Sequence, residues 1–218
     1  MFKYEERNKK SIYYYEGTRV LINKLDIRDF DELANIEKNI VARKLAFLYL
    51  EPINGKFDKT HLLNIHKFLF ESLYDFAGKI RDCDIAKNDL NGKPTIFCRP
   101  FAIEEQLDLL LNNMKKDLLI IKDRNDLIKK ISHYYCELNY IHPFREGNGR
   151  TIREFIREYI EFLSINNIIE NSIIEYSRMD KDLFLEGTIR AVMEDTTLLE
   201  KEFDKAIVKI DKDKNKKL

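Results

Sequence analysis

The chain has 218 residues, and its 38 basic and 38 acidic side chains give a formal net charge of zero. A balanced charge provides no global attraction to nucleic acid or to an anionic membrane, so we expect neither as a partner. Apolar residues make up 44% and charged residues 35% of the chain, which is typical of a folded cytoplasmic protein. With 7 glycines and 4 prolines, the composition favours helices over a β-sandwich or barrel.

The length fits one domain, and we predict a single domain over residues 1–218. The polar N-terminal segment 1–20 is expected to fray, and it lacks the apolar stretch of a signal peptide. The basic tail 211–218 is expected to be solvated. Apolar runs such as KLAFLYL are too short to cross a bilayer, so no membrane segment is expected.

Helical periodicity dominates between the two ends. Apolar residues three and four positions apart predict helices over 29–50, 58–78, 103–121, 125–141, 150–165, 180–193 and 198–210. Pro52 follows the first helix, and Asp58 is expected to cap the second. Gly78 is expected to end the second helix, and Asn125 to cap the fourth.

Segment 79–100 breaks this pattern. It alternates polar and apolar residues over 80–85, contains Asn91-Gly92, and resumes with TIFC, which together predict a β-hairpin. We see no second hairpin that would extend it into a sheet. Because an isolated hairpin is marginally stable in water, this one should lie on the helical body as a flap over a site.

The stretch HPFREGNGRTIR, residues 142–153, carries the strongest functional pattern. Gly147 and Gly149 allow positive φ and a close approach of the backbone to a ligand. Consecutive N–H groups at the start of a helix bind anions. Arg150 and Arg153 would share the first turn of that helix, where cations are unfavourable unless an anion lies between them. The pattern therefore predicts a polyphosphate site.

Two further side chains supply chemistry to this stretch. A carboxylate next to bound phosphates, here Glu146, is explained most simply as a Mg²⁺ ligand. The imidazole of His142 can take a proton from a hydroxyl group near neutral pH. Each feature alone is weak, but their combination in this order indicates a phosphate-transferring active site.

The same stretch resembles the signature of the Fic family, HPFx[D/E]GNGRxxR, which stands here complete. The resemblance extends from about residue 13 to about residue 210 and includes the upstream pieces LDIRDFDELANIE, IHKFLFESLYDFAGKIRDCDI and YYCELNYIHPF. It implies an all-α fold, with a compact helical core and one β-hairpin flap over the active site.

The resemblance implies an adenylyltransferase that uses ATP and Mg²⁺. AMP would pass from ATP to a Ser, Thr or Tyr hydroxyl of a target protein, and the tyrosines in SIYYYEG offer sites for self-modification. It implies that His142 is the general base and that Glu146 binds the metal. Three residues would cradle the phosphates, namely Gly147, Asn148 and Gly149. Arg150 would hold the β-phosphate and Arg153 the γ-phosphate. Phe144 would anchor the loop without taking part in the chemistry.

By the same resemblance, the flap over 81–98 would hold the hydroxyl-bearing segment of the target by strand pairing. Lys87 and Asn88 on the flap would also reach the nucleotide.

Two alternatives to AMP transfer stay open. Relatives of this fold transfer a phosphate or phosphocholine instead, but the phosphorylating branch has Lys in place of Gly149 and lacks an arginine at the position of Arg153. The other alternative is a regulatory module that binds ATP without transfer, and the presence of His142 argues against it.

Regulation is the point at which the chain departs from the family. Many members are silenced by a helix with the pattern [S/T]xxxE[G/N], of which this chain has no clean match. Glu186 has Asp182 at the Ser/Thr position, and Glu37 is flanked by Leu33 and Lys38 at the key positions. The alternatives are a separate small antitoxin that carries the helix, or an unregulated enzyme.

Overall fold

The computed structural model describes residues 4–6, 13–88, 94–117, 120–192 and 194–210. The predicted tail 211–218 and the hairpin turn at Asn91-Gly92 lie outside these residues. The chain divides into two compact units, the first formed by Met1–Gln106 with Ile141–Thr151 and the second by Leu107–Tyr140 with Ile152–Leu218. The prediction of a single domain stays a prediction.

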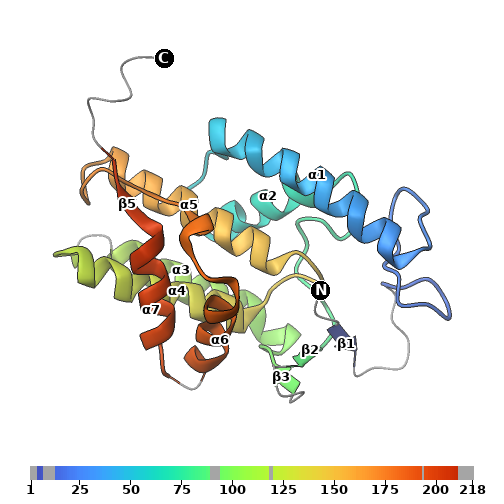
Figure 1. Cartoon of the computed structure of the whole chain (residues 1–218). Coiled ribbons are helices and arrows are strands. Elements are labelled where there is room, and N and C mark those ends of the chain that lie inside the picture. The colour runs from blue at the N-terminus through green and yellow to red at the C-terminus, as the bar shows by residue number, and fades with distance from the viewer. Residues whose placement is uncertain (1–3, 7–12, 89–93, 118–119, 193, 211–218) are drawn as a thin grey trace. The chain divides into compact units, whose positions relative to one another are not determined.

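Helices make up most of the described chain (Figure 1). The α-helices are α1 (Phe30–Leu50), α2 (Lys59–Phe70), α3 (Ile103–Asp117), α4 (Arg124–Ile141), α5 (Asn148–Ile165), α6 (Lys181–Ala191) and α7 (Thr197–Ala206). Two short 3₁₀-helices are η1 (Pro100–Ala102) and η3 (Tyr176–Arg178). The predicted helical core is thereby confirmed.

The caps of these helices explain where they begin. The carboxylate of Asp29 accepts the N–H of Glu32 at 2.8 Å, and that of Asp58 accepts the N–H of His61 at 3.0 Å. At α4 the predicted cap was wrong, because Asp123 rather than Asn125 accepts the N–H of Asp126 at 2.9 Å.

Helix α2 ends eight residues earlier than predicted. After Phe70 the chain turns, and the N–H groups of Leu73 and Tyr74 both donate to the carbonyl of Phe70, at 2.9 and 3.0 Å. The turn buries both side chains, which are 0% and 1% exposed. Burial thus overrides the helical periodicity, and Gly78, at φ +75°, lies in the turn region rather than at a helix end.

The predicted hairpin is confirmed as β2 (Ile85–Asn88) paired antiparallel with β3 (Pro94–Ile96). It does not stand alone, because β1 (Tyr4–Glu6) pairs with the other edge of β2, in the register Tyr4 with Lys87. The sheet order is therefore β1-β2-β3. Figure 1 shows these three strands side by side in the first unit.

The N-terminal segment is more ordered than predicted where it is described. Tyr14 forms a β-bridge with Leu21, and the N–H of Tyr15 donates to the carbonyl of Val20 at 3.0 Å. Val20 is 4% exposed. Within the described part of the predicted frayed segment, Tyr14, Tyr15 and Val20 are thus held by backbone contacts, while residues 16–19 are exposed.

The second unit has its own aromatic core. The ring of Tyr135 lies 5.1 Å from that of Phe184 and 5.5 Å from that of Phe203, so α4, α6 and α7 share one cluster. Strands β4 (Ser172–Ile174) and β5 (Ile207–Lys209) pair antiparallel beside it. The predicted helix over 198–210 is thus shorter, since residues 207–209 extend into β5.

None of the described helices is both long and apolar enough to cross a membrane.

Candidate active site

The stretch 142–153 forms a loop after α4 that runs into the start of α5. His142 has φ +46°, a left-handed conformation that costs a non-glycine residue on the order of 1–3 kcal/mol. Its imidazole is 3% exposed and stacks on the ring of Phe97, with the ring centroids 3.9 Å apart. Phe97 directly follows β3, so the base of the flap lies against the predicted general base.

Arg81 holds the backbone at this point. Its guanidinium is buried and donates from Nε to the carbonyl of His142 at 2.8 Å, and from Nη2 to the carbonyl of Ile141 at 3.3 Å. The same group donates to the carbonyls of Cys83 and Cys98 at the two ends of the flap, at 2.7 and 2.5 Å. One side chain therefore joins both ends of the flap to the loop that begins at His142 and stabilises the unusual backbone of that residue.

The rest of the loop is closed by a pair of hydrogen bonds. The side chain of Asn148 accepts the N–H of Phe144 at 2.8 Å and donates to its carbonyl at 2.7 Å. Asn148 is 1% exposed, so its side chain shapes the loop, and only its backbone is left for a phosphate. The ring of Phe144 is fully buried and stacks on His66, with centroids 3.7 Å apart. The predicted anchoring place of Phe144 agrees with this burial.

His66 is a neutral support of the loop that we did not predict. Its Nδ1 accepts the N–H of Gly78 at 2.8 Å, so Nε2 carries the proton and donates to the carbonyl of Glu146 at 3.0 Å. Burial lowers the pKa of His66 to about 3, which keeps the ring uncharged at neutral pH.

Gly147 is the position in the loop that only glycine fits. Its φ is +81°, and a Cβ built there would lie 2.3 Å from Cζ of Phe70. Gly147 precedes α5, whose first N–H groups, from Asn148 to Arg150, have no acceptor inside the helix. These N–H groups and the positive end of the helix dipole suit an anion, and the phosphate site predicted from the glycines stays a prediction.

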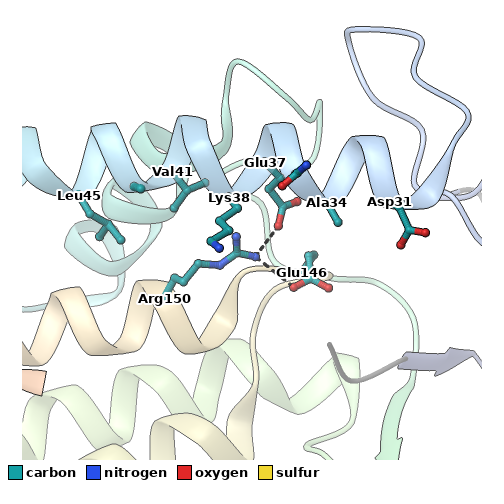
Figure 2. A pocket seen from close by; sticks show the side chains of 10 residues that line it. Asp31, Ala34, Glu37, Lys38, Val41, Leu45, Glu146 and Arg150 are labelled. Atoms are coloured by element: carbon teal, nitrogen blue, oxygen red, sulfur yellow. Dashed lines mark hydrogen bonds and ion pairs between the residues drawn. The ribbon is translucent and has the colours of Figure 1, made fainter. Parts of the chain in front are cut away.

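Glu146 and Arg150 flank this helix start. Oε1 of Glu146 accepts the N–H of Gly147 at 2.9 Å and lies 3.3 Å from Nη2 of Arg150. Burial and the neighbouring carboxylate of Glu37 raise the pKa of Glu146, and Arg150 opposes the rise. Both residues line a cavity of about 670 Å³ together with one face of α1 (Figure 2).

Glu146 suits a hard cation. Its Oε1 is engaged by protein donors, while Oε2 has no hydrogen-bond partner among the described residues. Mg²⁺ typically binds one or two carboxylates together with substrate phosphates. The described residues contain no group of three or more His, Cys, Asp or Glu side chains that would hold a metal by themselves. A cation at Glu146 would thus depend on phosphate oxygens for further ligands.

Comparison with known proteins finds a family whose matched region contains the loop described above. The model of the Fic/DOC family matches residues 56–160. A relative from Salmonella typhimurium, named "Probable protein adenylyltransferase Fic", is 31% identical over 147 residues, which cover 67% of this chain and 70% of the relative. The chain belongs to the Fic/DOC family.

Other relatives of the Fic/DOC family agree in length and fold. A protein of the same name from Escherichia coli K12 is 28% identical over 196 residues, 89% of this chain and 91% of the relative. The crystal structure of BepC from Bartonella tribocorum, with bound AMPPNP, superposes with a TM-score of 0.77 at 21% identity. It covers 91% of this chain and 97% of that one, which shows that the two share a fold.

The structure brings most of the predicted Fic/DOC site residues together. His142, Glu146, Gly147 and Arg150 lie in one loop and helix start of the first unit, with Asn148 and Gly149 between them. Arg153 follows Arg150 by three residues on α5 and belongs to the second unit. There its carbonyl accepts the hydroxyl of Tyr176 at 2.9 Å.

The flap residues are placed only by their backbone. Lys87 and Asn88 are the last two residues of β2, and their side chains lie outside what the structure describes. Their predicted contact with the nucleotide stays a prediction.

Three supporting residues of the Fic/DOC site were not predicted, namely Glu37, Arg81 and His66. Arg81 and His66 lie in a piece of sequence that carried the family resemblance, but nothing in its periodicity singled them out. Glu37 was considered only as an inhibitory residue. Each of the three contacts the loop or the start of α5 from a distant part of the sequence. A local sequence pattern cannot predict such contacts.

Proposed function

We propose that this protein is a Mg²⁺-dependent protein adenylyltransferase that transfers AMP from ATP to a hydroxyl group of a protein. The observation that carries the proposal is the loop itself, in which a buried histidine, a carboxylate and an arginine surround the start of α5. Relatives of similar length are named protein adenylyltransferases.

His142 takes the proton from the target hydroxyl in this mechanism. The hydroxyl oxygen then forms a bond to the α-phosphorus of ATP, the bond from that phosphorus to the bridging oxygen breaks, and pyrophosphate leaves. Two contacts hold the imidazole in place. The ring of His142 stacks on Phe97, and Arg81 donates a hydrogen bond to the carbonyl of His142.

The remaining residues bind and orient the phosphates. The N–H groups at the start of α5 and the guanidinium of Arg150 neutralise their charge, and Arg153 serves the γ-phosphate. Glu146 would hold Mg²⁺, which when bound neutralises phosphate charge and stabilises the pyrophosphate that leaves. Of the two carboxylates at Arg150, Glu37 is engaged by Arg150 and Tyr74, which leaves Glu146 as the candidate ligand of such a shared ion.

The target protein would bind along the flap, residues 81–98, by strand pairing. The contact between Phe97 and His142 supports this, because it brings the flap next to the general base. Self-modification of a tyrosine in SIYYYEG and a cytoplasmic location stay predictions, as does the absence of nucleic-acid binding.

For regulation we propose a separate small antitoxin, as in toxin–antitoxin systems. The support is the lack of a clean [S/T]xxxE[G/N] match within the 218 residues. Expression of the wild-type protein alone should be toxic to cells, and co-expression of its antitoxin should relieve the toxicity. Harmless expression, with no effect of any co-encoded partner, would contradict this version and favour the unregulated enzyme.

The test of the proposed activity uses ATP labelled at the α-phosphate, Mg²⁺ and the pure protein, with a cell lysate as the source of targets. Wild type should transfer label to protein and show a gain of one AMP by intact mass wherever it modifies itself. His142→Ala should lower the rate by about 10²–10⁴-fold, because the hydroxyl loses its base. His133→Ala, at an exposed histidine of α4, is the matched control and should keep the rate.

Three outcomes would contradict the proposal. Equal activity of His142→Ala and wild type would remove the mechanism. Label transferred from the γ-phosphate instead would indicate a phosphorylating relative. Binding of ATP without transfer from either position would indicate the regulatory module.

A further inference from the structure

Glu37 is a buried carboxylate in the middle of α1 that no motif of the sequence accounts for. It is 5% exposed, and each of its oxygens has its own partner. Oε1 lies 2.7 Å from Nη2 of Arg150, and Oε2 accepts a hydrogen bond from the hydroxyl of Tyr74. Figure 2 shows Glu37 and Glu146 both joined to the same end of the guanidinium of Arg150. Glu37 thus contacts the first arginine of the signature.

The contacts of Arg150 leave part of its guanidinium for a ligand. Both carboxylates meet the same nitrogen, Nη2, at 2.7 Å for Glu37 and 3.3 Å for Glu146. One face of the group lies over the ring of Phe70, 4.8 Å from its centroid. Nε and Nη1 have no hydrogen-bond partner among the described residues, and the side chain is 25% exposed beside the cavity. The group is therefore held from one edge while its other donors stay open.

The charges favour this arrangement. Burial by itself would lower the pKa of Arg150, and the carboxylates of Glu37 and Glu146 raise it above its ordinary value. The two ion pairs therefore offset the cost of removing the guanidinium from water and hold it in one place. If Glu37 lost its charge, Arg150 would depend on the more distant Glu146 alone and could turn away from the helix start.

We propose that Glu37 is a positioning residue that holds the guanidinium of Arg150 ready for the phosphates of ATP, and that Tyr74 in turn orients Glu37. This inference rests on the proposed function, since it assigns the anion at Arg150 to ATP. Glu37 does not act as an inhibitory residue at Arg150. It engages one nitrogen only, and its place in the 21-residue helix α1 and the bond from Tyr74 keep it from reaching the others.

The first experiment measures the dissociation constant of Mg·ATP by calorimetry for wild type and for Glu37→Gln. The amide keeps the size of the carboxylate and can still accept the hydroxyl of Tyr74, but it has no charge for Arg150. Affinity should fall by about 10–100-fold, which is the size expected when a charge-assisted hydrogen bond that holds the binding arginine is lost. Tyr74→Phe should weaken binding in the same direction by a smaller factor. Equal or tighter binding by Glu37→Gln would overturn the proposal.

A double-mutant cycle separates positioning from a general effect on the fold. If Glu37 acts through Arg150, Glu37→Gln should cause no further loss of ATP affinity in an Arg150→Ala background. Additive losses would show that Glu37 acts by another route and would overturn the proposal.

Glu202 provides a matched control in the second unit. It is a fully buried carboxylate that pairs with Lys205 and accepts the N–H of Asp180 at 2.8 Å. Glu202→Gln should lower the melting temperature and leave ATP affinity unchanged. A loss of ATP affinity equal to that of Glu37→Gln would mean that removing any buried carboxylate has the same effect, and the proposal would fail.

The two proposals fail separately. If wild type binds ATP but transfers no AMP, the proposed function fails, while the affinities still decide the role of Glu37. If wild type transfers AMP and Glu37→Gln binds ATP as tightly, only the role of Glu37 fails. If wild type binds no ATP, both are overturned.

Discussion

Arg81→Lys tests whether one buried guanidinium holds the flap and the loop of the candidate active site together. Arg81 donates to four carbonyls, two on the flap and two on the loop. A lysine ammonium is a compact group with no planar fork, and it cannot reach both sets at once. At least two charge-assisted hydrogen bonds should be lost, at about 1.5–3 kcal/mol each, so the free energy of unfolding should fall by about 3–6 kcal/mol.

Urea unfolding of wild type and variant measures this loss directly. Under conditions in which the variant is folded, AMP transfer should also slow by on the order of 10²-fold, because a shift of about 1 Å in the position of His142 has an effect of that size. ATP affinity should change less, because the carbonyls that Arg81 holds belong to the flap and to Ile141 and His142, whereas the start of α5 is the part that would bind phosphate. The control is Arg99→Lys, at a half-exposed arginine that pairs with Asp84. It should alter stability by less than about 1 kcal/mol.

A loss of stability below about 1 kcal/mol in Arg81→Lys would refute this reasoning, because a lysine would then satisfy all four carbonyls. A wild-type rate of AMP transfer in a folded variant would refute the link from Arg81 to His142. Both results can be obtained from the same preparation.

Three further predictions follow from contacts around the loop. Gly147→Ala should lower the free energy of unfolding by about 2–5 kcal/mol, because alanine adds strain at φ +81° and a clash with Phe70, and a stable variant in urea would contradict this. His66 has a pKa of about 3 in the folded state against 6.5 in its ordinary state, so only the unfolded state gains the proton as the pH falls through this window. Stability should therefore decrease by about 1.4 kcal/mol per pH unit between these values, and unfolding curves of His66→Gln should lack that part of the slope, whereas equal slopes would assign it to other groups. Arg153→Ala should weaken ATP binding by about 10–100-fold in a titration and leave the chain folded, because it removes the side-chain hydrogen bond to Tyr135 but keeps the backbone carbonyl that accepts the hydroxyl of Tyr176; unchanged affinity would remove Arg153 from the site.

Local patterns in the sequence were sufficient for the helices and for the order of the site residues. Helix α1 was predicted within one residue at its start, because Asp29 and the apolar spacing are local signals. The loop from His142 to Arg150 was likewise predicted, because a contiguous motif carries its own geometry.

The structural features that we missed depend on contacts between distant segments. Strand β5 forms because β4 offers it a partner, although its residues continue the helical pattern of α7. Helix α2 stops early because the turn after it buries Leu73 and Tyr74. Glu37 and Arg150 are in contact although they lie far apart in the sequence, and no spacing rule connects them.

The place of β1 has a consequence for how a substrate protein could be selected. Because β1 and β3 occupy the two edges of β2, an added strand would pair with the outer edge of β1 or of β3, and β3 is the strand that runs directly into Phe97. Pairing of this kind uses N–H and C=O groups that every protein possesses, and so it is largely indifferent to sequence. For a strand paired on β3, the hydroxyl that reacts would then be set by distance along the target chain. It would be the one that lies the right number of residues from the paired strand to reach the ring of His142.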